Sequence, residues 1–238
     1  MRLGVLTGSV RPTGYNYEGE PEPNDYGMPS SITAHLGLGP GEVLLISRHG
    51  VPPDIPPHMI NHAANIEALR VEGATHIISI CSSGALSSEI KVPSLMAPDD
   101  YIDFFSGDTI VDSRIEHVTP GFNEYMRELL IRSARGSPIP FLEEGIYVQT
   151  RGPRLETRAE VRFLRSIGDV VGMNLGSEAT IAKEMGIPFA GLVTIDNYAN
   201  GVNEEELDFR NILRSAEDKW DLASSILQRI LANSKVLD

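Results

Sequence analysis

A glutamate in the stretch YVQTRGPRLETRAEV, residues 147–161, follows a Gly-Pro-Arg-Leu turn and stands at the start of an expected helix. This carboxylate, Glu156, has two interpretations. It could simply favour the helix, because negative charge near a helix N-terminus interacts well with the helix dipole. It could also accept a hydrogen bond from a ligand that offers an N–H group. The local sequence leaves both open and by itself favours the helix-start interpretation.

Two loops that follow apolar runs near the N-terminus have the composition of an anion site. The turn LTGSV, residues 6–10, offers backbone N–H groups and the Ser9 hydroxyl. The turn SRHG, residues 47–50, offers the guanidinium fork of Arg48 and a further possible donor, His49. Each motif alone is weak, since Gly-Ser turns are common and Arg48 could pair with a surface acid.

Three later loops extend this pattern. They are ICSSGAL (80–86), VGMNLGSE (171–178) and TIDNYANG (194–201). Ser82 or Ser83 could donate hydrogen bonds, whereas Asn197 and Asn200 could also merely form turns. Cys81 is interpreted as buried packing and not as a nucleophile. The five loops together indicate a site better than any one of them.

The elements that must position these loops alternate between short apolar runs and helical spacing. Expected strands cover 2–8, 42–47, 76–82, 145–150, 169–173 and 189–195, and expected helices cover 61–73, 157–168, 177–186 and 217–234. Such alternation predicts an α/β protein with a mixed or largely parallel central β-sheet flanked by helices. Ligands of these sheets bind at the carboxyl ends of the strands, where the polar loops lie.

Length and composition restrict the class of protein. The 238 residues fit one domain, 1–238, and the Pro-rich, acidic stretch 10–31 is interpreted as a surface loop. A net charge of −13 argues against a nucleic-acid or anionic-membrane partner. A single cysteine, no signal-peptide pattern and no apolar run of about 18 residues predict a soluble, cytoplasmic protein. The six histidines show no metal-ligand spacing.

Three segments carry a family resemblance: LLISRHGVPPDIPPHMINHAANIEALRVEGATHIISICSSGAL (44–86), GPRLETRAEVRFLRSIGDVVGMN (152–174) and NYANG (197–201). Together they resemble the trimeric purine nucleoside phosphorylases, especially the methylthioadenosine and methylthioinosine phosphorylase branch. The resemblance implies a single-domain phosphorylase fold, a homotrimer with sites near subunit boundaries, inorganic phosphate as co-substrate, and no cofactor or metal.

The resemblance also assigns residues. The implied phosphate site is Ser9, Arg48, His49, Ser82 and Asn174, and the implied purine site is Leu155, Glu156, Asn197 and Ala199. Met173 would lie against the ribose, and His117 would reach the 5′ end of a neighbouring subunit's ligand. Asn197, Glu156 and His49 would be catalytic.

The base-reading residues predict which purine is bound. In phosphorolysis, phosphate attacks C1′ of an oxocarbenium-like ribosyl group while a donor near N7 stabilises the departing base. Asn197 could be that donor, and Glu156 could accept from N1–H of a 6-oxopurine, whereas adenine presents a bare acceptor at N1. The adenine-specific enzymes of this family carry serine and aspartate at these two positions. The pair therefore favours a 6-oxopurine.

The segment ELDFRNILRS, residues 206–215, would lie at the 5′ end. It lacks histidine and offers Phe209 and Ile212, which suit a methylthio group better than a hydroxyl. The expected reaction converts 5′-methylthioinosine to hypoxanthine and 5-methylthioribose 1-phosphate. The alternatives are a methylthioadenosine phosphorylase, a catalytically weak purine-binding protein and, less favoured, a nucleosidase. A dinucleotide-binding oxidoreductase would require a G-x-G-x-x-G turn after the first strand, and LTGSVRPTG does not contain one.

Three departures from the family pattern fall at the phosphate and ribose sites. The turn TGSV keeps Gly8 and Ser9 but places Val10 where the family has glycine, prolines fill the segment after RHG, and Asn174 replaces a threonine or serine. These departures predict a less efficient phosphate site beside an intact base-reading pair.

Overall fold

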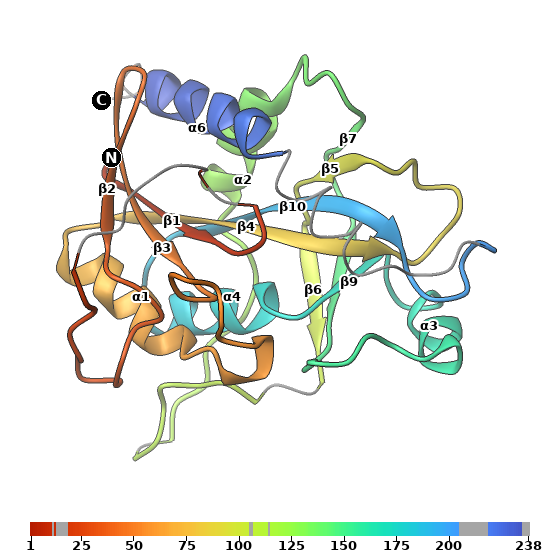
Figure 1. The fold of residues 1–238 in the computed structure, drawn as a ribbon, viewed down its shortest axis with the longest axis horizontal. Coiled ribbons are helices and arrows are strands. Elements are labelled where there is room, and N and C mark those ends of the chain that lie inside the picture. The colour runs from red at the N-terminus through yellow and green to blue at the C-terminus, as the bar shows by residue number, and fades with distance from the viewer. Residues whose placement is uncertain (11, 13–18, 105–106, 114, 205–218, 235–238) are drawn as a thin grey trace.

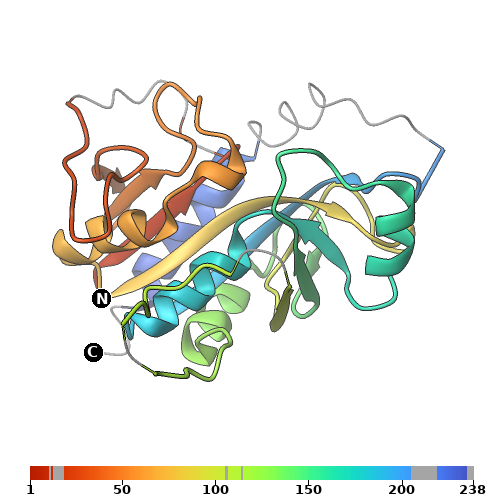
Figure 2. The same ribbon diagram turned by 90° about the horizontal axis from the view of Figure 1, so that it is seen from below.

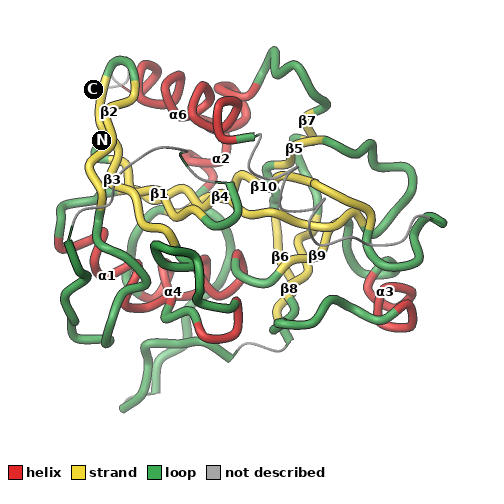
Figure 3. The backbone as a smooth tube through the Cα atoms, viewed as in Figure 1, coloured by secondary structure: helices red, strands yellow, loops and turns green. Residues whose placement is uncertain are grey.

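The computed structural model of the chain describes residues 1–10, 12, 19–104, 107–113, 115–204 and 219–234. Within them the strands are β1 (Leu3–Thr7), β2 (Ala34–Leu38), β3 (Gly41–Ser47), β4 (His76–Ala85), β5 (Ser94–Met96), β6 (Asp100–Asp103), β7 (Phe141–Leu142), β8 (Ile146–Gln149), β9 (Val170–Gly172) and β10 (Phe189–Tyr198). The helices are η1 (Pro57–Met59), α1 (His62–Val71), α2 (Glu124–Ala134), α3 (Arg158–Leu164), α4 (Leu175–Glu184) and α6 (Trp220–Ser234). Each expected strand and helix has a counterpart among these elements, and Figure 3 shows their distribution along the backbone.

The strands form one mixed sheet, as the sequence predicts. The main path runs β2-β3-β1-β4-β10-β5-β7, while β9 pairs with β4 and leads through β8 to β6. Strands β3, β1, β4 and β10 are parallel to one another. Strand β2 pairs antiparallel with β3, β5 with β10, and β9 with β4. The carboxyl ends of the four parallel strands therefore meet at one edge of the sheet.

Helices cover both faces of this sheet. Helices α2 and α6 lie on one face and α1 and α4 on the other, which Figures 1 and 2 show from perpendicular directions. Successive residues of β3 alternate between the two cores, since Val43 packs toward α6 and Leu44 toward α1. This period of two is what a strand buried on both faces requires.

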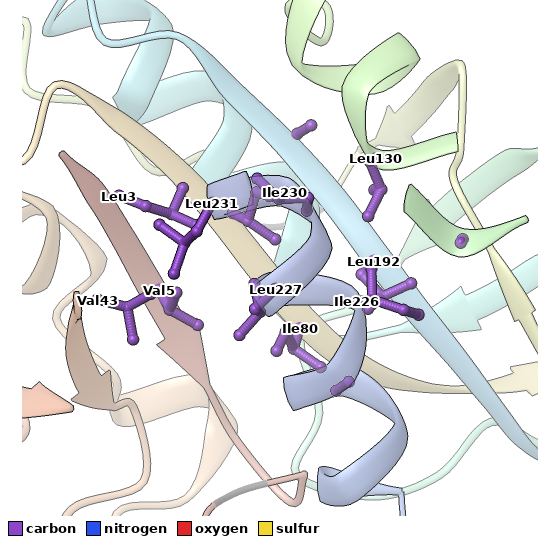
Figure 4. Packing of buried hydrophobic residues seen from close by; sticks show 14 of the residues in the cluster. Leu3, Val5, Val43, Ile80, Leu130, Leu192, Ile226, Leu227, Ile230 and Leu231 are labelled. Atoms are coloured by element: carbon purple, nitrogen blue, oxygen red, sulfur yellow. The ribbon is translucent and has the colours of Figure 1, made fainter. Parts of the chain in front are cut away.

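Helix α6 seals one of the two cores. Its Ile226 and Ile230 are fully buried with Leu3 and Val5 of β1 and Ile80 of β4. Figure 4 shows these side chains between the helix and the sheet. Burying a side chain of this size stabilises the fold by about 1.5–3 kcal/mol before the entropy cost of ordering. The central strands are thus packed on both faces, and this packing fixes the positions at which the loops begin.

The loop after β1 is tied to α1 where the structure describes it. Asn24 donates from Nδ2 to the Ala64 oxygen (2.8 Å), and the Ser30 N–H donates to Asn65 Oδ1 (2.7 Å). Residues 11 and 13–18 lie outside the described part of the chain. That residues 1–238 form one domain stays a prediction. Among the described helices, none has the length and apolar character needed to cross a membrane.

Candidate active site

A pocket of about 510 Å³ opens at the edge where the parallel strands end. Of the residues expected from the sequence, Ser9, Arg48, His49, Ser82, Leu155, Glu156, Met173, Asn174, Asn197 and Ala199 line it. These residues come from loops after β1 and β3, from β4, from the turn before α3, from the β9–α4 junction and from β10. The loops that were expected to converge do so.

Other lining residues were not part of the expected set. They are Gly8, Pro53, Asp54, Ile55, Pro56, Pro57, Ser83, Gly84, Pro153, Val171, Gly172 and Asn200. The run Pro53–Pro57 forms a wall, although the sequence showed it only as a departure from the family pattern. Prolines without a charged or amide side chain carry no chemical signature, so only the fold reveals this role.

Arg48 is almost completely buried, with 1% of its surface exposed. Its Nη1 donates to the Ile80 oxygen (3.0 Å), and its Nη2 donates to the Leu6 oxygen (3.1 Å) and Ser79 Oγ (2.7 Å). Glu178 of α4 faces the same guanidinium, with Oε1 2.8 Å from Nε and Oε2 3.2 Å from Nη2. Arg48 is therefore held by protein acceptors and does not present the free fork that the sequence suggested.

Glu178 is fully buried beside Arg48. Burial raises the pKa of the Glu178 carboxyl, but Arg48, His62 and Ser79 together outweigh burial and hold this pKa below its usual value. Ser79 Oγ also donates to Glu178 Oε2 (2.5 Å). The positive charge at this end of the pocket is thus balanced by a carboxylate that the strand-end motifs did not reveal.

The His49 ring donates a hydrogen bond through Nδ1. Its Nδ1 lies 2.8 Å from the Ile55 oxygen, and because a carbonyl can only accept, Nδ1 carries the proton and Nε2 carries the lone pair. Burial lowers the pKa of His49, and the charge of Arg48 lowers it further. The sequence suggested a donor at His49, whereas its geometry favours a neutral ring with an acceptor at Nε2.

The glycine of the TGSV turn lies close to both side chains. A Cβ at Gly8 would be 3.0 Å from Arg48 Nη1 and 3.3 Å from His49 Nε2, tighter than ordinary packing. Only a glycine lets the backbone approach this closely without displacing them. Gly8, Arg48 and His49 therefore form one corner of the pocket.

Glu156 stands just before helix α3 and is 93% shielded, with 7% of its surface exposed. Thr150 Oγ1 donates to its Oε1 (2.6 Å). The helix itself is capped by Thr157, whose side chain accepts from the Glu160 N–H (3.2 Å) while Glu160 Oε2 accepts from the Thr157 N–H (2.7 Å). The capping box satisfies the helix start, so Glu156 is left to line the pocket.

Asn197 is positioned by a bulge in β10. The pairing of β10 with β4 shifts between Ile195 and Asn197, which places one extra residue in β10 opposite β4. Bulges of this kind re-aim side chains at sheet edges. The Asn197 Nδ2 donates to the Tyr198 oxygen (2.8 Å) and lies beside Gly84, where a Cβ would be 3.2 Å away.

The extra residue in the bulge, Asp196, is buried and ion-paired. Its Oδ2 accepts from Thr194 Oγ1 (2.7 Å), and its Oδ1 pairs with Lys219 at the start of α6. Burial lowers the pKa of Lys219 to about 8. This pair ties the bulge of β10 to the residue that precedes α6.

Asn174 offers the pocket an unsatisfied oxygen. It precedes α4 without capping it through its side chain, and its Oδ1 is buried with no hydrogen-bond partner among the described residues. Its backbone N–H donates to Tyr147 Oη (3.3 Å). An unpaired buried amide oxygen is costly, so a bound ligand with a donor would satisfy it.

Of the residues expected around the ribose and the 5′ end, Met173 lines the pocket. His117 is exposed and does not line it. Phe209 and Ile212 lie outside the described residues. Within the part of the chain that the structure describes, no group of three or more His, Cys, Asp or Glu side chains could hold a metal ion.

Comparisons with known proteins find relatives that are named as nucleoside phosphorylases. A protein of Archaeoglobus fulgidus named probable 6-oxopurine nucleoside phosphorylase is 51% identical over 178 residues, 74% of this chain and 73% of that protein. The probable S-methyl-5′-thioinosine phosphorylase of Thermodesulfovibrio yellowstonii is 32% identical over 87% of this chain and 80% of its own length.

The fold is shared with a solved structure. Methylthioadenosine phosphorylase from Schistosoma mansoni, in complex with adenine, superposes with a TM-score of 0.87 at 23% identity, covering 100% of this chain and 92% of that chain. The sequence model of the phosphorylase superfamily matches residues 7–232. The chain therefore belongs to the phosphorylase superfamily.

Proposed function

We propose that this protein is a purine nucleoside phosphorylase that cleaves a 6-oxopurine nucleoside, with 5′-methylthioinosine favoured. The products are the purine base and 5-methylthioribose 1-phosphate. One observation carries the proposal: the Glu156 carboxylate and the Asn197 amide line the same pocket as Ser9, Arg48 and His49. Relatives named for 6-oxopurine and thioinosine phosphorolysis support it.

At the base end, the donors and acceptors fit a lactam purine. Thr150 occupies Oε1 of Glu156, which leaves Oε2 without a protein donor among the described residues and free to accept N1–H. One N–H of the Asn197 amide is used by Tyr198, and the other can donate to O6 or N7. A donor at N7 stabilises the negative charge that the leaving purine develops.

At the phosphate end, the corner formed by Gly8, Arg48 and His49 would hold the nucleophile. The Gly8–Ser9 turn offers N–H and hydroxyl donors to phosphate oxygens. The acceptor at His49 Nε2 can take a hydrogen bond from the phosphate O–H, which orients the ionised oxygens toward C1′. The bound anion then stabilises the cationic sugar electrostatically.

The wall formed by residues 53–57 supports a methylthio substituent. Four of its five residues, Pro53, Ile55, Pro56 and Pro57, give the pocket apolar surface, and Asp54 is the charged residue between them. A 5′-hydroxyl placed against the apolar part would lose its hydration without compensation. We assign these residues to the 5′ end together with Phe209 and Ile212.

We further propose a cytoplasmic homotrimer that serves purine salvage. His117 is exposed and stands away from its own pocket, so in a trimer it would reach the 5′ end of a neighbour's ligand. The buried thiol of Cys81, which forms no disulfide, suits a reducing compartment. Inorganic phosphate is the co-substrate, and the chemistry assigned to these residues uses no metal or organic cofactor.

The test is product release from 5′-methylthioinosine, 5′-methylthioadenosine and inosine, each with and without phosphate. Hypoxanthine released from methylthioinosine only when phosphate is present is the expected result. Adenine released faster than hypoxanthine would overturn the roles of Glu156 and Asn197. Release without phosphate would identify a nucleosidase.

A second candidate follows from Arg48. Because its N–H groups face Leu6, Ser79, Ile80 and Glu178, the chain could instead be a purine-binding protein with weak turnover. Hypoxanthine binding at micromolar concentration without phosphate-dependent product would favour this alternative.

A further inference from the structure

An arginine-rich segment borders the active site on its outer side. Arginines stand at positions 151, 154, 158, 162 and 165 of a chain that has only 20 lysines and arginines and a net charge of −13. Arg154 is neutralised by Glu160, with Nη1–Oε2 and Nη2–Oε1 distances of 2.7 Å. The three arginines that follow are not neutralised in this way.

Arg158, Arg162 and Arg165 line a second cavity of about 500 Å³. Their spacing of four and three residues places them on one face of α3, whose last turn continues into Arg165 with helical backbone angles. Val161 and the segment from Gly201 to Glu204 also line this cavity. A volume of this size suits a small-molecule ligand.

These three guanidinium groups have no ion-pair or hydrogen-bond partner among the described residues. Among the described residues, Glu204 is the one acid that lines the cavity. A cation near a helix C-terminus is favourable, which could account for Arg165, but Arg158 is the first residue of α3, where the helix dipole disfavours positive charge. Helix stability therefore does not explain the cluster.

Arg158 is also preorganised. The backbone of Gly201 has a φ of +79° and passes so close that a Cβ there would be 2.9 Å from Arg158 Cγ. The aliphatic stem of Arg158 is thus held against Gly201, which reduces the entropy that a ligand must remove to use its guanidinium.

Consecutive residues of one turn line the two cavities. Asn197, Ala199 and Asn200 line the active site, and Gly201 and Val202 line the arginine cavity directly after them. The turn is closed by the Val202 N–H, which donates to the Ala199 oxygen (3.0 Å). On the other side, Glu156 and Arg158 are separated only by the helix cap. A charge bound at the arginines would act on both base-reading segments.

We propose that the arginine cavity binds a small polyanion with two or three adjacent phosphate groups, of the nucleoside di- or triphosphate kind, and that its occupancy changes the KM for the purine nucleoside. Planar guanidinium forks bind phosphate oxygens in pairs, and three of them on one helix face can follow a short phosphate chain. The effect on KM rests on the proposed function, whereas the binding itself does not.

The first experiment measures binding of inorganic tripolyphosphate by calorimetry to the wild type, to Arg162→Gln/Arg165→Gln and to Arg132→Gln. Arg132 is an exposed arginine of α2 that lines neither cavity, so it is the matched control. Saturable binding that weakens about tenfold or more in the double variant, stays unchanged in Arg132→Gln and falls with added salt is expected. Thermal midpoints of the three proteins establish that each is folded.

Further arms distinguish the source of the anion. Adenosine triphosphate should bind like tripolyphosphate, while citrate and single phosphate ions should bind more weakly at this site. Equal binding by wild type and double variant, or equal binding of citrate, would overturn the proposal. So would a change in oligomeric state of the double variant without a change in tripolyphosphate binding, because the arginines would then serve a contact between copies.

The second experiment measures phosphorolysis with and without tripolyphosphate. A change of about threefold or more in the nucleoside KM of the wild type, absent in the double variant, is expected. If binding is seen but KM is unchanged, the coupling is refuted. If no substrate is cleaved at all, the proposed function fails while the binding result still stands.

Discussion

The Nδ2 atom of Asn200 donates a hydrogen bond to the main-chain oxygen of Glu156 over 3.1 Å. This contact joins the turn after β10 to the turn before α3, so the two segments that carry the base-reading residues are held together. The geometry between Glu156 and Asn197 therefore depends on the fold and not on either loop alone.

Exchanging the base-reading pair should exchange the purine. We expect Glu156→Ser/Asn197→Asp to lose about 10²- to 10⁴-fold in kcat/KM with methylthioinosine, because N1–H then has no carboxylate acceptor. Activity with methylthioadenosine should rise in the same variant. Competing both substrates in one reaction measures the ratio directly, and Asn233→Ala, in α6 and not among the pocket's lining residues, is the control. An unchanged ratio would contradict the assignment.

Removing the carboxylate behind Arg48 should destabilise the whole protein. Glu178→Gln leaves a buried, uncompensated guanidinium, which typically costs about 3–5 kcal/mol of unfolding free energy. Urea denaturation measures this loss. Arg48→Met/Glu178→Leu should recover much of the stability but not the activity, because an apolar pair needs no compensation. A double variant less stable than Glu178→Gln would argue against the ion pair as the cause.

The pH dependence of phosphate use should report His49. Burial lowers its pKa below the ordinary value of 6.5, so the neutral ring that accepts at Nε2 persists below that pH. As pH falls through the lowered pKa, the ring becomes protonated and loses its acceptor. We divide kcat/KM for phosphate of the wild type by that of His49→Gln at each pH. We expect this ratio to stay constant as the pH falls to 6.5 and to decrease below pH 6.5. Taking the ratio cancels the ionisation of phosphate itself, and a fall beginning above 6.5 would exclude this role.

The cap of α3 should make a pH-dependent contribution to stability. Arg154, followed by the Thr157 N–H, lowers the pKa of Glu160 to about 2. A lowered carboxyl pKa stabilises the fold above the ordinary value of 4.5, and the contribution is lost as pH falls toward 2. Glu160→Gln keeps the cap and removes only the charge, so it should cost roughly 0.5 kcal/mol at pH 7, as exposed pairs do.

The measurement for Glu160 is the difference in unfolding free energy between wild type and Glu160→Gln from pH 7 to pH 3. The gap should narrow below pH 4.5. Glu124→Gln, in the exposed first turn of α2, serves as the control for loss of a single surface charge. A gap that does not narrow as the pH falls would mean that the negative charge of Glu160 does not stabilise the fold through this pair.

The sequence predicted the central strands and the loops that meet at their ends, because buried β-branched runs and the glycines after them are local signals. It missed β2, β5, β6, β7 and α2. Most of these strands are short, and their pairing depends on neighbours that are distant in the chain. The capping box at Thr157 could have been read locally, and it would have freed Glu156 from the helix-start interpretation.

The arrangement of Arg48 could not be predicted from its motif. Its carboxylate partner, Glu178, is 130 residues away in the sequence and belongs to helix α4. Neither SRHG nor GSEAT contains a local signal that Arg48 and Glu178 are in contact, because this ion pair depends on tertiary packing. The bulge that aims Asn197 is likewise a property of how β10 pairs with β4 and not of its composition.

Strand β4 sets the distance between the two ends of the ligand pocket. Arg48 donates a hydrogen bond to the Ile80 oxygen, and Asn197 lies beside Gly84. The anion end and the base end of the pocket are therefore separated by four residues of one extended strand, about 13 Å. Since β4 is buried between two cores, this spacing cannot stretch to suit a longer molecule. The protein should consequently reject nucleosides with a spacer between sugar and base even when both ends carry the right chemical groups.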